Sequence, residues 1–302
     1  MDSQRLAKNK LITILMMLII SLYFMPRHGE ALDVFETKLL ASDGQASDRL
    51  GRSVAISGNR AVVGAYFDDN QRGSAYLFEF HDNEWIEVAK LTASDGTGSD
   101  RFGSPVAISE DGNTVAVGAT QDDSRRGSAY VYQWDGSSWQ ETKLVGSQSR
   151  SGHFCGQVGV NEDGTVVLSG CPNDEPGKLY VFTFDGSGWS EAAILTASDG
   201  GRGLGADPHI QGDTIAVANH RDNSEQGAVY VFERTEATWI EQAKLTASDG
   251  APGDLFGLEN VDLNNGVIVV GAQQHDGNGL DNSGSAYVFE FNGLAWVEVT
   301  SH

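Results

Sequence analysis

Basic residues are scarce in this chain of 302 residues, in which 20 Lys and Arg stand against 42 Asp and Glu. The formal net charge at pH 7 is −22. A protein that binds nucleic acid needs a basic surface to neutralise phosphates, so this balance excludes nucleic acid as a partner. An acidic surface is typical of a soluble protein in an extracellular or saline medium.

Catalytic motifs are also missing. The sequence has no His-Glu-x-x-His, no Gly-x-Ser-x-Gly, no Gly-x-x-x-x-Gly-Lys and no Cys-x-x-Cys. Paired carboxylates for glycoside chemistry could exist, but no spacing selects a pair. We therefore predict that the protein is not an enzyme, and a carbohydrate-active enzyme is the alternative.

No apolar run is long enough to cross a membrane. The longest, Leu11–Met25, has fifteen residues, whereas a spanning helix needs roughly 20. A basic stretch precedes it, and Gly29-Glu30-Ala31 supplies small residues at the two positions that a signal peptidase reads. We predict a cleavable signal peptide over residues 1–31, a secreted or cell-surface protein, and no transmembrane span.

Cysteine occurs only twice, as Cys155 and Cys171. The two residues flank a predicted hairpin that turns at about Glu162-Asp163, so they should be cross-strand neighbours. In a secreted protein this arrangement favours a disulfide, and closing a loop of this size contributes ~3 kcal/mol. A pair of buried free thiols is the alternative if the signal peptide is absent.

What the sequence has in abundance is a repeat of about fifty residues. Five Lys-Leu or Ile-Leu pairs end at leucines that are 52, 53, 51 and 50 residues apart: Leu39, Leu91, Leu144, Leu195 and Leu245. Each copy also has a tyrosine nine residues before a tryptophan, beginning with Tyr76 and Trp85. A fixed period of this length with short strands inside it is the signature of a propeller or solenoid array.

Each copy contains four strand-length apolar runs, which we name A to D, joined by turns of Gly, Asp, Asn and Ser. In the second copy we expect strands at Phe102–Ile108, Thr114–Ala119, Ser128–Trp134 and Trp139–Lys143. Strand B runs such as Val267–Ala272 are apolar at consecutive positions, so neighbouring sheets must cover both of their faces.

The predicted fold is therefore all-β, a β-propeller of four-stranded antiparallel blades. The five repeats lie at about 38–89, 90–142, 143–193, 194–243 and 244–299. A closed five-bladed ring and a part of a larger propeller both remain open. Leu32–Leu40 reads as a lone strand D, and it either competes with Trp296–Val299 for one place or shares that place with it.

Several distinctive residues fall in strand A. Pro105 and Pro208 fall there, which fits an innermost strand with one edge facing the axis. The fourth copy carries Asp207 and His209 in this strand, and the fifth adds one residue, which suggests a bulge before Val261.

Leu50-Gly51, Phe102-Gly103, Leu204-Gly205 and Phe256-Gly257, with Val-Gly-Ala runs at 63–65, 117–119 and 270–272, resemble FG-GAP repeats. The resemblance covers essentially all of residues 32–299, so we expect one domain over 32–302. It implies the propeller of integrin α-subunits and of many secreted or surface proteins, whose ligand-binding loops lie on one face.

In an up-and-down blade, the D–A and B–C loops emerge on that same face, and they are rich in carboxylates. The predicted ligand face consists of Asp43, Asp48, Asp95, Asp100, Asp249 and Asp254 in D–A loops and Asp68, Asp69, Asp122 and Asp123 in B–C loops. Collectively these acids predict binding or adhesion to an extracellular protein or glycan. Turn chemistry explains any single one of them, so a structural surface repeat without a small-molecule ligand is a third alternative.

Calcium is the one candidate cofactor. In integrin-like repeats the ion sits in a long A–B loop, but here those hairpins are too short to wrap six or more oxygens around an ion. The family's metal sites therefore do not carry over. The remaining candidate ligands are Asp276, Asn278 and Asp281, although Leu280 occupies a place where a ligand would be expected.

Overall fold

The computed structural model describes residues 36–236 and 238–299, and the chain separates into two units, Met1–Lys38 and Leu39–His302. All of the described strands belong to the second unit. The predicted signal peptide lies outside the described residues, and the domain boundaries stay a prediction. In the part of the chain that is described, no helix is both long and apolar enough to pass through a membrane.

Five four-stranded sheets make up the second unit, and in each sheet consecutive strands pair antiparallel, as in a meander. We number them blades 1 to 5. Blades 1 and 2 contain β1 (Val54–Ser57), β2 (Arg60–Ala65), β3 (Ser74–His81), β4 (Glu84–Leu91), β5 (Phe102–Ile108), β6 (Thr114–Ala119), β7 (Ser128–Trp134) and β8 (Trp139–Leu144). Blade 3 contains β9 (Gln157–Val160), β10 (Val166–Cys171), β11 (Lys178–Phe184) and β12 (Trp189–Leu195).

Blades 4 and 5 repeat this pattern. They contain β13 (Ala206–Gln211), β14 (Thr214–Asn219), β15 (Ala228–Thr235), β16 (Thr238–Leu245), β17 (Phe256–Asn264), β18 (Val267–Ala272), β19 (Ser285–Phe291) and β20 (Trp296–Glu298). The strands predicted for the second copy are confirmed, except that β8 extends one residue further, to Leu144. The predicted bulge is confirmed too, since the register of β17 with β18 shifts between Phe256 and Val261.

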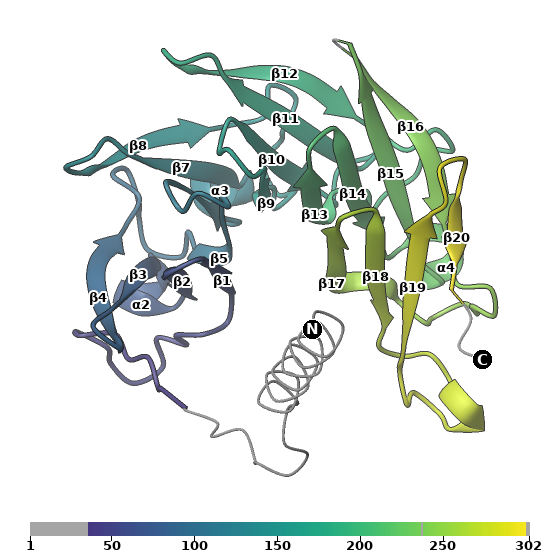
Figure 1. Cartoon of the computed structure of the whole chain (residues 1–302), viewed down its shortest axis with the longest axis horizontal. Coiled ribbons are helices and arrows are strands. Elements are labelled where there is room, and N and C mark those ends of the chain that lie inside the picture. The colour runs from purple at the N-terminus through teal and green to yellow at the C-terminus, as the bar shows by residue number, and fades with distance from the viewer. Residues whose placement is uncertain (1–35, 237, 300–302) are drawn as a thin grey trace, which may run out of the picture. The chain divides into compact units, whose positions relative to one another are not determined.

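The blades follow one another around an axis, with strand A of each blade innermost (Figure 1). β1 packs with β5, β5 with β9, β9 with β13, and β13 with β17. Strand A is an edge strand in every sheet, which explains why Pro105 and Pro208 are tolerated there. The fold is therefore an all-β propeller.

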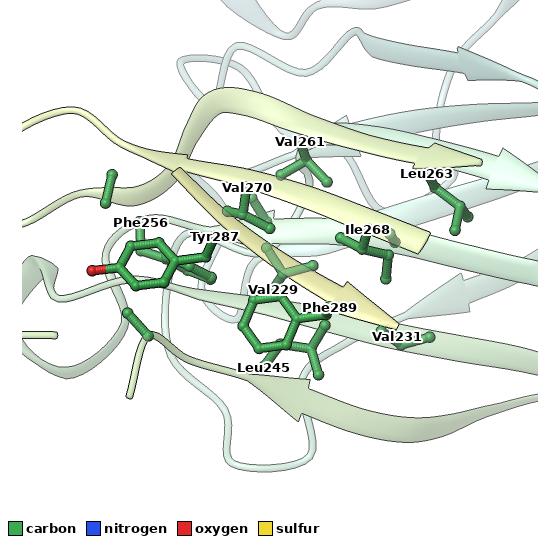
Figure 2. Close-up of a cluster of buried hydrophobic side chains, with 14 of the residues drawn as sticks. Val229, Val231, Leu245, Phe256, Val261, Leu263, Ile268, Val270, Tyr287 and Phe289 are labelled. Atoms are coloured by element: carbon green, nitrogen blue, oxygen red, sulfur yellow. The ribbon is translucent and has the colours of Figure 1, made fainter. Parts of the chain in front are cut away.

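Apolar side chains from two blades interdigitate at each seam. Figure 2 shows the seam between blades 4 and 5, where Val229 and Val231 lie against Val270, Tyr287 and Phe289. Corresponding clusters join the other neighbouring blades. The prediction that neighbouring sheets cover both faces of strand B is thus confirmed for blades 2 to 4.

The two end blades differ from that prediction. Blades 1 and 5 stand at opposite ends of an open arc (Figure 1), so the five blades do not close a ring within this unit. Val269 in β18 is 43% exposed, because no described blade follows it. The lone strand expected at Leu32–Leu40 is not formed over its described part, residues 36–40, and β20 provides strand D of blade 5.

Cys155 and Cys171 form a disulfide, with their Cα atoms 4.2 Å apart. The predicted pairing is confirmed. The hairpin register pairs Gly170 with Gln157, so the turn lies about one residue later than expected.

The seams bring backbones unusually close together. A Cβ atom on Gly118 would lie 2.0 Å from the carbonyl oxygen of Gly156 in the next blade. Gly64 and Gly170 would meet Gly103 and Gly205 at 1.9 and 1.8 Å. A side chain at these positions would therefore push two blades apart.

We predict that Gly118→Ala lowers the free energy of unfolding by about 2 kcal/mol, because the added methyl group overpacks the seam. Urea denaturation measures the change. Gly188→Ala is the control, since a Cβ atom there has no neighbour within 4 Å. Equal stability of the two variants would contradict the close-approach argument.

Candidate functional site

In blade 2, one lysine links two loops of the loop face, which is the face that carries the D–A and B–C loops. Lys143, near the end of β8, pairs with Asp95 at 2.6 Å and with Asp122 at 2.7 Å. Tyr130 donates to Asp95 at 2.7 Å, and Ser128 donates to Asp122 at 2.5 Å. We call this five-residue set the lysine node. It joins a D–A loop to a B–C loop by placing one cation against two carboxylates.

The lysine and its two carboxylates recur in blades 1 and 4. Their contacts are 2.6 to 2.8 Å long and involve Lys90 with Asp43 and Asp68, and Lys244 with Asp199 and Asp222. Blade 4 has Ala228 in place of the serine. Blade 3 has Ile194 at the lysine position, and Lys178 pairs with Asp174 instead. In blade 5, Tyr287 donates to Asp249 at 2.7 Å.

The lysine node shifts the pKa values of Lys143 and Asp95 in the directions that favour their charged forms. Burial opposes the charge of Lys143, but hydrogen bonds with Asp122 and Asp95 outweigh it and raise the pKa of Lys143 above 10.5. Burial likewise opposes the charge of Asp95, and the bonds from Lys143 and Tyr130 hold the pKa of that carboxyl below 3.8. Lys143 and Asp95 are therefore both charged between these two values.

Three other predicted ligand-face residues stabilise turns. Asp48, Asp100 and Asp254 each accept the backbone amide of the residue three positions earlier, at 2.5 to 2.7 Å. Aspartate commonly forms such bonds in turns. Most of the ten predicted aspartates thus have a structural partner: Asp43, Asp48, Asp68, Asp95, Asp100, Asp122, Asp249 and Asp254. Their role in ligand binding stays a prediction.

The B–C loops of blades 1, 2 and 4 have a backbone that the sequence did not predict. They form short turns labelled α2 (Asp68–Gln71), α3 (Asp122–Arg125) and α4 (Asp222–Glu225). In each turn the last three residues have φ between +44° and +68°. Left-handed geometry costs roughly 1–2 kcal/mol for each residue with a side chain. Contacts around these turns must therefore hold them in place.

Backbone hydrogen bonds from the next D–A loop provide that support. The amides of Arg101 and Phe102 donate to the carbonyls of Gln71 and Arg72 at 2.8 and 3.0 Å. The same pair of bonds, at 2.9 and 3.0 Å, joins Phe154 and Cys155 to Arg125 and Arg126, and Leu255 and Phe256 to Glu225 and Gln226. The B–C loop of one blade and the D–A loop of the next therefore form one stiff surface.

Asp69 and Asp123 stand out on this surface. They occupy the same position in neighbouring blades, and their side chains are 65 and 60% exposed. Their ion pairs with Arg72 and Arg126 are long, at 4.0 and 3.8 Å. Such pairs on a surface contribute little to stability, so both carboxylates are available to a partner.

An aromatic patch beside Asp69 occurs in blade 1. Tyr66 and Phe67 pack edge to face with their ring centroids 4.5 Å apart. The Arg49 guanidinium lies 4.1 Å from the centroid of Phe67, and that of Arg101 lies 5.7 Å from it. Arg49 also donates to the Tyr66 hydroxyl at 2.5 Å. Sequence reasoning missed this patch, although Tyr66-Phe67 replaces the polar Thr120-Gln121 of the next copy.

The candidate calcium loop contains the 3₁₀ turn η1 (Gly277–Gly279). Asp276 accepts the amide of Asn282 at 2.8 Å, a bond that closes the loop. Within residues 36–236 and 238–299, no group of three or more His, Cys, Asp or Glu is arranged to hold a metal ion. Calcium binding by Asp276, Asn278 and Asp281 stays a prediction.

A cavity of about 520 Å³ lies along the inner strands, and its walls include Val54, Ile56 and Ile210. His209, which also lines this cavity, lies between Asp207 and Asp262. Its Nε2 atom is 3.5 Å from the Asp207 carboxylate, and its Nδ1 atom is 3.5 Å from the Asp262 carboxylate. Burial opposes the charge of the ring, but both carboxylates outweigh it and raise the pKa of His209 above 6.5. The trio bridges blades 4 and 5, since Asp207 also accepts the Val261 amide at 2.7 Å.

We predict that Lys143→Met costs about 2 kcal/mol of unfolding free energy at neutral pH, because two carboxylates lose their cation. The effect should fade in acid, since Asp95 has a lowered pKa and stabilises only above it, and in strong base, where Lys143 itself loses its proton. Guanidinium denaturation at several pH values tests this. Arg202→Met, which removes an exposed ion pair with Glu175, is the control. Equal losses of unfolding free energy in the two variants would show that the lysine node does not stabilise the fold.

We also predict that His209→Ala lowers the melting temperature more at about pH 5.5 than at about pH 8.5. The raised pKa of His209 means that its stabilisation is complete below 6.5 and is lost as the pH rises through the folded-state value. His81→Ala is the control, because that ring is exposed beside Asp82. A difference between wild type and His209→Ala that does not change with pH would refute the assignment.

Comparison with known proteins supports the repeat architecture described above. The FG-GAP repeat family model matches residues 34–78, 85–132 and 239–289. Integrin alpha-11 of mouse is 33% identical over 125 residues, and human integrin alpha-11 is 30% identical over the same length. Each match covers 36% of this chain and 10% of the relative, so the chain spans about a tenth of those proteins.

Solved structures are similar in fold alone. A functionally unknown protein from Desulfotomaculum acetoxidans has a TM-score of 0.52 at 12% identity, over 82% of this chain and 68% of the other. A Bacteroides fragilis protein with a provisional 6-phosphogluconolactonase name has a TM-score of 0.55 at 10% identity, over 82% and 69%. The five blades, the Leu-Gly and Phe-Gly pairs at the seams and the three matched segments together show that this chain carries FG-GAP repeats.

Proposed function

We propose that this protein is a secreted or cell-surface binding module that recognises an extracellular protein or glycan through the loop face of blades 1 and 2, with no catalysis of its own. Asp69 and Asp123 carry the proposal, because they repeat in register on adjacent blades and remain exposed while most neighbouring acids are bonded. The FG-GAP match and the partial similarity to integrin α chains support a binding role.

The stiffness of the loop face favours recognition. A partner need not order these loops, because backbone bonds already join each B–C turn to the next D–A loop. Less conformational entropy is then lost on binding. The two carboxylates attract basic groups and raise the association rate, and Tyr66, Phe67 and Arg49 are of the types enriched at the centres of interfaces.

We predict that the double variant Asp69→Asn, Asp123→Asn binds its partner at least about tenfold more weakly, because two exposed charges are lost without a change of shape. Partners would first be found on arrays of purified extracellular proteins and glycans, and affinities measured by biolayer interferometry. Asp82→Asn with Glu84→Gln is the matched control, since it removes two exposed charges from a C–D turn on the opposite face.

Two outcomes would reject the proposal. One is a binder that is weakened equally by both double variants, which would place recognition elsewhere. The other is release of product from a glycan, which would favour the carbohydrate-active enzyme. A chain that binds nothing on the arrays and whose melting temperature no probe raises would favour the purely structural role.

A further inference from the structure

A cavity of about 410 Å³ lies between blades 1 and 2, at the end of the blades that carries the A–B and C–D turns, opposite the loop face. Blade 1 contributes Arg60, at the start of β2, and Glu79, near the end of β3. Blade 2 contributes Trp134 and Trp139, on either side of the turn that joins β7 to β8. We call this space the seam cavity. A concave surface with aromatic rings and a few polar groups is typical of a small-molecule site.

Two tryptophans form the aromatic wall of the seam cavity. Trp134 ends β7, Trp139 begins β8, and the two residues are opposite each other in the sheet. Their ring centroids are 5.5 Å apart, and their planes are inclined at 51°. Both residues are half-buried, so part of their aromatic surface is accessible. Such a surface suits a sugar ring, because the face of an aromatic ring is electronegative and attracts the C–H bonds on one side of the sugar.

Arg60 and Glu79 form the polar wall, and their side chains are 18 and 31% exposed. The Arg60 Nε atom donates to Glu79 Oε1 at 2.6 Å, and Nη1 donates to the Gly112 carbonyl and to Asn113 Oδ1, both at 2.9 Å. These bonds hold the guanidinium in one orientation. Within residues 36–236 and 238–299, neither Arg60 Nη2 nor Glu79 Oε2 makes a hydrogen bond. The ion pair therefore keeps one donor and one acceptor for a ligand.

Arg60 lies near the two tryptophans without stacking closely on either. Its guanidinium carbon is 6.0 Å from the ring centroid of Trp134 and 5.7 Å from that of Trp139. In the aromatic patch of blade 1, by contrast, the guanidinium carbon of Arg49 is 4.1 Å from the centroid of Phe67. A ligand that packs on the tryptophans of the seam cavity is therefore within reach of the Arg60 donor.

Only one of the five repeats has arginine at the Arg60 position, and only one has tryptophan at the Trp134 position. The equivalent residues of the other blades are Thr114, Val166, Thr214 and Val267 for Arg60, and Phe80, Phe184, Arg234 and Phe291 for Trp134. At the next seam, the Trp189 indole donates at 3.0 Å to Gln133, which is the counterpart of Glu79. There the polar and aromatic walls bond to each other, whereas at the seam cavity both remain available to a ligand.

We propose that the seam cavity binds a neutral hexose unit of a glycan. One face of the sugar ring packs on Trp134 and Trp139, while one hydroxyl group accepts from Arg60 and a neighbouring hydroxyl group donates to Glu79. The Arg60–Glu79 pair has no net charge, and the net charge of −22 on the chain disfavours an acidic sugar. The site is on the opposite face from Asp69 and Asp123, so it does not depend on the function proposed above.

Titration of the purified full chain with three neutral glycosides tests the proposal. The probes are methyl β-D-glucopyranoside, methyl β-D-galactopyranoside and methyl α-D-mannopyranoside, and binding is followed by saturation-transfer difference NMR and by tryptophan fluorescence. We expect at least one of them to bind saturably with a dissociation constant of about 1 mM, because a single sugar ring offers few atoms for contact. The same glycoside should change the tryptophan fluorescence, since its ring lies against two indoles.

Two variants that copy blade 4 locate the site without disturbing the fold. Arg60→Thr reproduces a threonine–glutamate pair that is bonded at 2.8 Å in blade 4, and Trp134→Arg introduces the residue that blade 4 has at this position. Each should weaken glycoside binding at least about tenfold. Arg234→Thr is the matched control, because Arg234 lies 5.7 Å from the ring of Trp239 in blade 4, away from the cavity.

The proposal is overturned if none of the three glycosides binds saturably to the wild type. It is also overturned if Arg60→Thr and Trp134→Arg, with melting temperatures that show them to be folded, bind as tightly as the wild type. Equal weakening by Arg234→Thr would likewise reject the seam cavity as the site.

Discussion

The contact on which this structure depends is the approach of a glycine in one blade to the backbone of the next. Gly64, Gly118 and Gly170 let neighbouring sheets come close enough for valines and aromatic rings to interdigitate. A single four-stranded sheet cannot cover both of its apolar faces, so its stability depends on its neighbours. The same contact determines how each blade is turned, and therefore where its loops emerge.

The loop face is rigid because neighbouring blades pack closely against one another. Once two blades are fixed, the left-handed B–C turn of one lies within hydrogen-bonding reach of the next D–A loop, and the bonds that form sustain a costly backbone. The lysine node adds a second link, since Lys143 holds carboxylates from both kinds of loop. Most of the acidity of this face is internal structure rather than free charge.

The repeat made the fold predictable, because its spacing reports blade length and its apolar runs report strands. It predicted the edge position of Pro105 and the disulfide of Cys155 with Cys171 as well. The contacts of the loop face were harder to predict from the sequence. Lys143 is 48 residues from Asp95, and only the stacking of consecutive strands brings them together. The exposure of Val269 was missed because its sequence is like that of a covered strand B.

Residues that break the repeat are therefore the better guide to specificity. A lysine between two carboxylates presents nearly the same chemistry in three blades, so it cannot by itself distinguish one partner from another. Tyr66 and Phe67, in contrast, place aromatic surface at one point on the arc, and His209 places a titratable group in one seam. Because a repeated scaffold supplies position and stiffness, a few such departures are enough to make one face of it selective.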